Sequence, residues 1–260
     1  MEIIKNAVKV GNSAGVLLPK KWLNLQVKVI VGPLNIEMEV FEILLKENYL
    51  KQILGVYIVG SYARNEQTID SDVDILVITD NINKKIKKGR YEIMLVSKKS
   101  LENSIRKNIF PIIPMLVEAK TIINEGIRKK YMNIEMNSRN LRFHIETTNS
   151  AMNVVNAEIS LAKELREKGI SDNIVYSLVL RLRTLYIIDC LRKNKIWSKK
   201  EFLELIKKIG GSTLAYEGYL RSKNNKKEMS ELGIEEAIKL MNYIKKKNKE
   251  TEKWLREKKD

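Results

Sequence analysis

The chain has 260 residues, of which 44% are hydrophobic and 31% charged, a balance typical of folded rather than disordered proteins. Its 48 Lys and Arg residues exceed its 32 Asp and Glu residues, giving a formal net charge of +16. Such an excess favours polyanionic partners, although lysine-rich helices with solvated charges give the same composition. No apolar stretch is long enough to cross a bilayer and no export signal opens the chain, so we expect no membrane partner and a cytoplasmic location.

Residues 1–32 are predicted to form a small β domain that ends at Gly32-Pro33. Three short runs have strand character: Ala7–Val10, Gly15–Leu18 and Val27–Val31. A Gly-Asn-Ser turn separates the first two runs, and Pro19 ends the second before a single helical turn from Lys20.

Residues 33–128 alternate between helix and strand patterns, which predicts a small α/β (α+β) domain. The expected helices are Leu34–Asn48 and Leu101–Lys107, and the expected strands are Val56–Val59, Val73–Ile78, Tyr91–Val96 and an edge strand over Met115–Asn124.

Residues 129–260 are predicted to form a helical bundle, with charge-dense residues 245–260 frayed. The expected helices are Ser138–Lys168, Asp172–Lys193 and Lys199–Ile209, the last with Ser198 and Glu201 as a capping box. Leu178, Leu182, Leu185 and Ile188 recur at helical spacing and should face the bundle core.

Two carboxylates one residue apart open the second predicted strand. Side chains alternate along a strand, so Asp72 and Asp74 project from one face while Val73 and Ile75 face the core. Two adjacent acids are costly unless a cation neutralises them, and Mg²⁺ accepts carboxylates together with phosphate oxygens. The pair therefore predicts a metal–triphosphate site.

A glycine and a serine follow the preceding buried strand. Gly60 permits close approach of the backbone, and Ser61 adds a hydroxyl donor, so this turn is a candidate phosphate-binding element. A third acid is available in the next strand, where Glu92 lies on the face opposite Tyr91 and Ile93. If that strand pairs beside Val73–Ile78, Glu92 converges on the two aspartates.

Gly60-Ser61, ten intervening residues and then Asp72-x-Asp74 resemble the signature of the DNA polymerase β nucleotidyltransferase superfamily. The Tyr62-Ala63-Arg64 step is most similar to its minimal nucleotidyltransferase branch, the MntA-like proteins. That branch commonly has Gly where Asn65 stands here.

The resemblance implies an Mg²⁺-dependent enzyme with two metals held by Asp72, Asp74 and Glu92. The enzyme would transfer an NMP, with AMP expected, from a nucleoside triphosphate to a protein, an RNA or a small molecule, as MntA-like antitoxins of toxin–antitoxin pairs do with protein. Arg64 is expected either to neutralise phosphate charge or to pair with Glu66.

Residues 8–23 resemble the SpoVT/AbrB-like family of small DNA-binding β domains through their Gly-Asn-Ser-x-Gly turn and the proline before a basic turn. Members form intertwined homodimers and often act as antitoxins or transcriptional regulators. The resemblance would place Lys9, Lys20 and Lys21 near DNA phosphates. The Gly-Asp turn often seen before the last strand is replaced here by Asn24-Leu25-Gln26, and a purely dimerising role stays open.

The helical region offers weaker candidates. Its position beside the transferase pattern resembles aminoglycoside nucleotidyltransferases and fused or paired HEPN proteins, and Arg181 or Arg183 is expected to face the nucleotide or to form structural ion pairs. Arg139 and His144 superficially match the Arg-x4-His motif of HEPN ribonucleases, whereas a capping or interdomain histidine is the simpler interpretation, and Glu146 is a candidate general base.

Two functions therefore follow from the sequence. The first is a nucleotidyltransferase, and the alternative is a DNA-binding regulator or antitoxin with an inactive transferase fold. The retained Gly60, Ser61, Asp72 and Asp74 favour the first, because paired acids without a metal are a liability.

Overall fold

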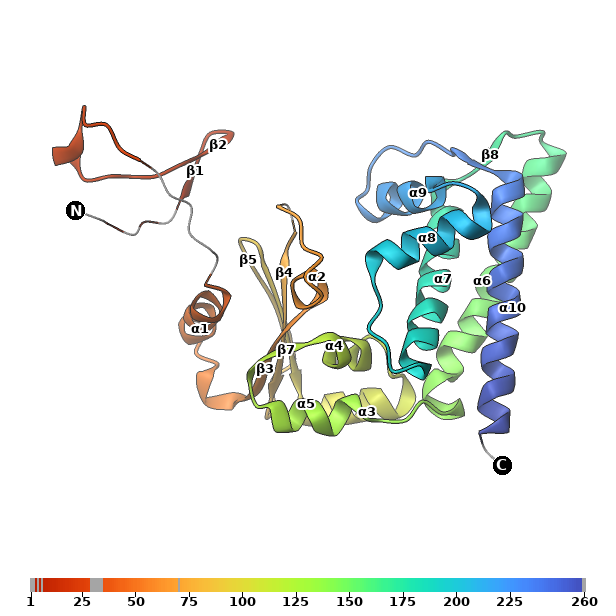
Figure 1. Cartoon of the computed structure of the whole chain (residues 1–260), viewed down its shortest axis with the longest axis horizontal. Coiled ribbons are helices and arrows are strands. Elements are labelled where there is room, and N and C mark those ends of the chain that lie inside the picture. The colour runs from red at the N-terminus through yellow and green to blue at the C-terminus, as the bar shows by residue number, and fades with distance from the viewer. Residues whose placement is uncertain (1–2, 4, 6, 29–34, 70, 259–260) are drawn as a thin grey trace. The chain divides into compact units, whose positions relative to one another are not determined.

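The computed structural model describes residues 3, 5, 7–28, 35–69 and 71–258. The chain divides into two compact units, Met1–Met38 and Glu39–Asp260 (Figure 1).

The N-terminal unit is a short hairpin followed by a turn of 3₁₀ helix over Lys20–Trp22. Strands β1 (Val8–Val10) and β2 (Ser13–Gly15) pair antiparallel around Gly11, whose φ of +59° suits the tight turn. The expected second strand, Gly15–Leu18, is wrong beyond Gly15. Residues 29–31 of the expected third strand and the Gly32-Pro33 boundary lie outside the described residues. None of the described residues in 3–28 is fully buried, so the hairpin has no core of its own.

The second unit begins with a mixed five-stranded sheet whose order is β5-β6-β4-β3-β7. Its strands are β3 (Ile53–Val59), β4 (Val73–Thr79), β5 (Lys84–Lys88), β6 (Tyr91–Ser97) and β7 (Lys120–Ile123). Strands β4 and β6 run parallel and the other neighbours antiparallel. The α+β fold class is therefore confirmed.

Five helices accompany this sheet among the described residues. They are α1 (Ile36–Lys46), α2 (Gly60–Ala63), α3 (Lys98–Lys107), α4 (Ile112–Glu118) and α5 (Glu125–Met132). The expected strand Met115–Asn124 is wrong in its first half, because residues up to Glu118 are helical and strand pairing starts at Lys120. The apolar run of α4 packs into the core through Ile112, Ile113 and Leu116, which overrides its β-branched composition.

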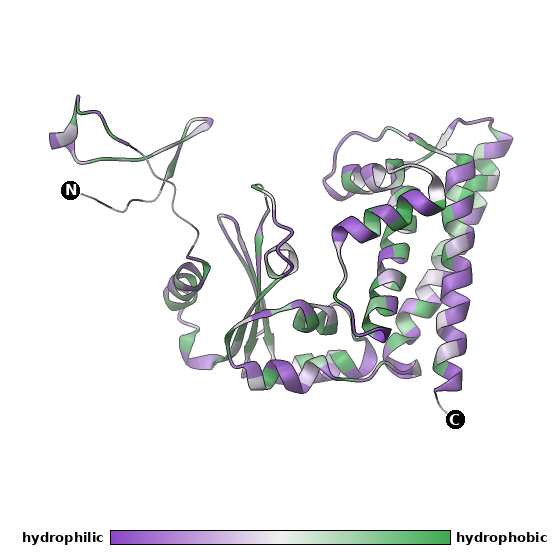
Figure 2. Cartoon of the chain, in the orientation of Figure 1, coloured by the Kyte–Doolittle hydropathy of each residue, from purple (hydrophilic) through white to green (hydrophobic). Residues whose placement is uncertain are grey.

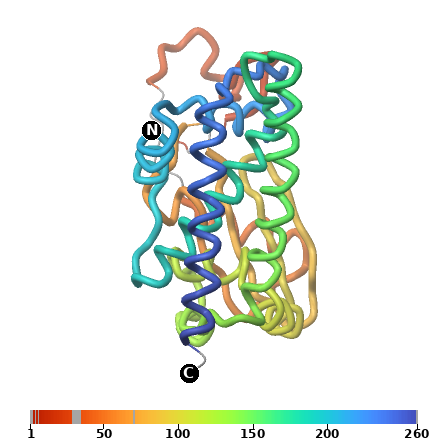
Figure 3. Tube along the Cα trace, turned by 90° about the vertical axis from the view of Figure 1, so that its right-hand side faces the viewer, coloured from red at the N-terminus to blue at the C-terminus, as the bar shows by residue number. Residues whose placement is uncertain are grey.

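The remaining chain is a helical bundle, as predicted. Its elements are α6 (Ser138–Glu164), β8 (Gly169–Ile170), α7 (Asp172–Arg192), α8 (Lys199–Gly210), α9 (Leu214–Lys223), β9 (Leu232–Gly233) and α10 (Ile234–Glu257). Helices α6 and α10 are the longest and lie side by side (Figure 3). The Ser198 hydroxyl caps α8 by accepting from the Glu201 N–H. The reciprocal half of the expected capping box is absent, because the Ser198 N–H donates to the Tyr186 hydroxyl instead. The expected fraying is wrong before Lys258, because α10 buries Thr251 and Leu255.

One hydrophobic core joins the sheet to the bundle. It extends from Tyr57 of β3 through Leu101 of α3 to Leu178 of α7 and Leu255 of α10. The charged faces of α8 and α10 point away from it (Figure 2). Among the described helices, none is both long enough and apolar enough to traverse a bilayer.

Candidate active site

The acidic cluster is built by strand register. Asp74 of β4 lies opposite Val59 of β3 on one side and opposite Glu92 of β6 on the other. Directly paired residues project from the same face of a sheet, so the Asp74 and Glu92 carboxylates are neighbours. Asp72 lies two residues before Asp74, just ahead of the start of β4 at Val73. The strand that carries Glu92 therefore pairs beside the strand that carries Asp74, as the predicted convergence of Glu92 on the aspartates requires.

The acids act on one another electrostatically. Burial is the main cause that raises the pKa of the Asp74 carboxyl, and the negative charges of Glu92 and Asp72 raise it further. The positive charges of Lys223 and Arg64 act in the opposite direction. A half-buried carboxylate with two acidic neighbours has a local excess of negative charge that a cation can relieve.

Asp72, Asp74 and Glu92 have the oxygen ligands that a hard divalent cation prefers, but their side chains do not converge on one point. Within the described ranges, no three Asp, Glu, His or Cys side chains are arranged so that they could hold a metal. Instead, the exposed Glu92 accepts an ion pair from Lys87 Nζ at 2.6 Å. Exposed ion pairs contribute little stability, so Glu92 can leave Lys87 at small cost. Three carboxylates supply the oxygen ligands that Mg²⁺ prefers.

Gly60 is required by the geometry of the turn into α2. Its φ is +71°, and a Cβ at this position would overlap the Asp74 carboxylate, so glycine lets the backbone pass directly beside that acid. The Gly60 N–H donates to Glu118 Oε1 at 2.7 Å. The amide expected to contact a phosphate thus already has a protein partner. Among the described residues, the half-buried Ser61 hydroxyl has no hydrogen-bond partner.

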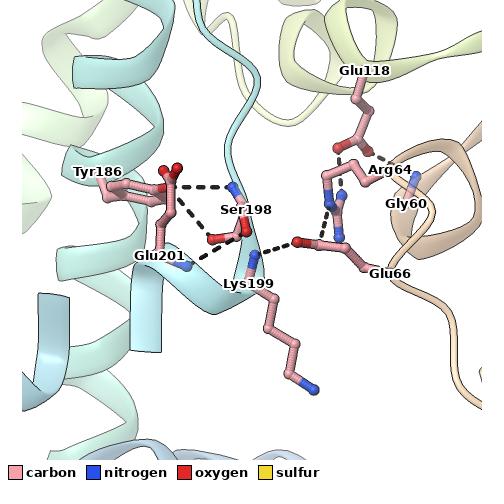
Figure 4. A network of polar contacts seen from close by, with 8 residues as sticks. All are labelled: Gly60, Arg64, Glu66, Glu118, Tyr186, Ser198, Lys199 and Glu201. Atoms are coloured by element: carbon pink, nitrogen blue, oxygen red, sulfur yellow. Dashed lines mark hydrogen bonds and ion pairs between the residues drawn. The ribbon is translucent and has the colours of Figure 1, made fainter. Parts of the chain in front are cut away.

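Glu118 connects this turn to Arg64 and was not anticipated from the sequence. The Arg64 guanidinium donates through Nη1 to the buried Glu118 carboxylate and through Nε to Glu66 Oε2 at 2.9 Å (Figure 4). Burial raises the pKa of Glu118, and the Arg64 charge opposes this rise. Arg64 therefore has the Glu66 partner that the sequence offered as one alternative. The sequence signal for Glu118 is an acid that closes an apolar run, a pattern that predicts a strand here.

The helical bundle reaches the same network. The Lys199 N–H at the start of α8 donates to Glu66 Oε1 at 2.7 Å (Figure 4). An adjacent hollow of about 160 Å³ has Arg64, Arg183, Tyr216 and Lys223 in its lining. Of the two arginines singled out in α7, Arg183 thus lines the hollow, whereas Arg181 donates to Thr147 Oγ1 at 3.1 Å.

The other candidates lie elsewhere. His144 is buried, contacts Asn108 Oδ1 at 2.6 Å and packs edge-on against Phe110, which fits an interdomain histidine rather than a ribonuclease site. Glu146 is exposed and pairs with Arg142 at 2.7 Å. The exposed lysines expected near DNA belong to the N-terminal unit: Lys9, Lys20 and Lys21.

Comparison with known proteins assigns the central segment. Residues 37–141 match the family model described as a nucleotidyltransferase domain. This segment contains the Gly60 turn, both aspartates and Glu92, and the match supports the class of nucleotidyl-transferring enzymes.

Two solved structures resemble the chain at low identity. A nucleotidyltransferase-like protein from Exiguobacterium sibiricum is 14% identical, with 83% of this chain and 75% of that chain covered and a TM-score of 0.39. Spectinomycin adenyltransferase AAD(9) from Enterococcus faecialis, solved with ATP and spectinomycin, is also 14% identical, with 82% and 98% covered and a TM-score of 0.38. No curated protein matches the chain in sequence.

Proposed function

We propose that the chain is an Mg²⁺-dependent nucleotidyltransferase that moves an NMP, with AMP expected, from a nucleoside triphosphate to an acceptor hydroxyl. The acceptor belongs to a protein, an RNA or a small molecule, and the protein case would make the enzyme antitoxin-like. The observation that carries the proposal is the position of Asp74, in register with Glu92 and against a glycine that its carboxylate requires.

The residues of the proposed site have separate roles in the transfer. Asp72, Asp74 and Glu92 would hold two Mg²⁺ ions, which supply charge neutralisation for the phosphates and the leaving pyrophosphate. The Ser61 hydroxyl is free to donate to a phosphate oxygen, and Arg64 contributes positive charge beside Asp74. The acceptor oxygen forms a bond to the α-phosphorus as the bond to pyrophosphate breaks, and the hydroxyl proton passes to water. The Gly60 turn and Glu118 keep these groups in place.

The first prediction is that Asp72→Asn together with Asp74→Asn abolishes transfer, by at least about a thousandfold, because metal-binding charge is lost. The measurement is label transfer from each α-labelled nucleoside triphosphate, with Mg²⁺ and with or without cell extract. Asp80→Asn is the matched control, since Asp80 is an exposed acid just after the other end of β4. Full activity in the double variant would refute the assignment, and removal of Mg²⁺ with a chelator should imitate the variant.

The N-terminal unit supports a second, separate proposal. We propose that Lys9, Lys20 and Lys21 contact duplex DNA, because all three are exposed on or beside one hairpin. Changing all three to Gln should weaken duplex binding about a hundredfold at low salt and flatten its salt dependence. A gel-shift series in increasing salt measures this effect, and Asp72→Asn with Asp74→Asn should leave it unchanged. Duplex binding by the wild type without transfer of any label would favour the regulator instead.

A further inference from the structure

Two hollows lie at the start of α8. The inner hollow, of about 160 Å³, is the one that Arg64, Arg183, Tyr216 and Lys223 help to line. The outer hollow, of about 390 Å³, lies along α8. Lys199 lines both, so the two hollows meet at this residue.

The charged residues that line them are mostly positive. Six are cationic and two are acidic: Arg64, Arg183, Lys199, Lys200, Lys207 and Lys223 against Glu66 and Glu204. We call the combined lining of the two hollows the basic groove. Glu66 pairs with Arg64 Nε at 2.9 Å, so these two charges offset each other and leave five cations against Glu204 in the lining.

The inner end of the basic groove reaches the proposed reaction centre. Arg64 lines the inner hollow and directly follows α2, whose first residue, Gly60, has its backbone against the Asp74 carboxylate. A ligand lying in the groove can therefore place one end beside Asp74 while the rest extends along α8.

An aromatic ring stands among these cations. Tyr216 is half-buried in the lining of the inner hollow, its ring stacks on Tyr219 at 5.7 Å between centroids, and Lys199 Nζ lies 5.9 Å from its centroid. An accessible ring backed by a second ring and flanked by positive charges is the arrangement that proteins use to stack bases between phosphate contacts.

We propose that the basic groove binds a single-stranded nucleic acid whose terminus is the acceptor of the transfer. The binding part stands by itself, and the acceptor part rests on the proposed function. Cations along α8 contact successive phosphates, Tyr216 stacks one base, and the terminal hydroxyl lies beside Asp72 and Asp74.

The test measures binding of a fluorescently labelled single-stranded RNA 12-mer to the full chain by anisotropy, without nucleoside triphosphate and over a series of salt concentrations. Lys200→Gln with Lys207→Gln should weaken binding about tenfold. The slope of log K against log salt should fall by about 1.4, because about 0.7 is lost for each single-strand phosphate contact.

The matched control is Lys245→Gln with Lys249→Gln, which removes the same charge from another lysine-lined hollow, on α10. This pair should weaken binding less than twofold, and equal weakening by both pairs would overturn the proposal in favour of general charge attraction. Tyr216→Leu should weaken binding about fivefold with an unchanged salt slope. A polyglutamate peptide that competes as well as unlabelled RNA would also overturn it.

RNA binding by the basic groove and the proposed transferase function can be refuted independently of each other. Asp72→Asn with Asp74→Asn should keep RNA binding while losing transfer. A wild type that binds RNA in the groove but transfers no label refutes the proposed function alone. A wild type that labels protein but not the bound RNA refutes the acceptor role. If transfer is retained but RNA binding does not change when Lys200 and Lys207 are replaced, RNA binding by the basic groove is refuted.

Discussion

At the scale of single residues, the backbone of Gly60 and the carboxylate of Asp74 occupy neighbouring space, so any side chain at Gly60 would overlap the acid. We predict that Gly60→Ala lowers transfer at least a hundredfold and the free energy of unfolding by about 3 kcal/mol. The positive φ accounts for about 1 kcal/mol and the overlap with the acid for the rest. Activity assays and urea denaturation measure the two effects.

Gly89 provides the control for backbone strain. Its φ is +56°, yet a Cβ there would meet nothing within 4 Å, so Gly89→Ala should cost about 1 kcal/mol and leave transfer intact. Equal losses of stability and activity in the two variants would mean that Gly60 serves backbone conformation alone.

The sequence predicted that Glu92 lies beside Asp74, because the expected pairing of the two strands is present and sets their register. Glu118 could not be found in that way. Its importance depends on α4 ending beside the Gly60 amide and Arg64, more than fifty residues earlier in the chain. A contact of that kind is specified by tertiary packing rather than by pattern.

At the scale of elements, Glu118 ties the C-terminal end of α4 to α2, and Arg64 continues the connection through Glu66 to the start of α8 (Figure 4). We predict that Glu118→Gln lowers the free energy of unfolding by about 2 kcal/mol, because the half-buried Arg64 loses one of its charged partners while the amide contact can persist. Urea denaturation at pH 7 measures the change.

The exposed pair of Arg142 and Glu146 is the reference for this variant. Glu146→Gln removes an i,i+4 surface ion pair and should cost less than about 0.5 kcal/mol. An equally small cost for Glu118→Gln would show that burial of the acid and its attraction to Arg64 cancel.

Helices α6, α7 and α8 could be predicted closely because their caps and apolar spacing agree. The segment from Ile112 to Ile123 could not, since a β-branched apolar run fits a buried helix and a strand equally well. Charge density alone predicts a frayed end of α10. Thr251 and Leu255 alternate with those charges at helical spacing and bury one face, which holds the helix together up to Glu257.

At the scale of the whole molecule, the N-terminal unit is unlike the rest because its apolar side chains have no interior to enter. Leu17 and Leu23 are 70% and 71% exposed, and Val10 is 52% exposed. Apolar residues gathered on so small a unit favour association with a second copy, as the expected homodimer requires.

We predict that Leu17→Ser with Leu23→Ser converts a dimer to a monomer, which sedimentation equilibrium can measure at micromolar concentration. Leu161→Ser with Leu165→Ser is the control, because these leucines are 49% and 61% exposed on or beside α6 in the other unit. The control should keep the dimer. Transfer activity should persist in the monomer, because the acids, the Gly60 turn and the basic groove all belong to Glu39–Asp260. A monomeric wild type, or a dimer that survives the N-terminal changes, would contradict the proposed role of this unit.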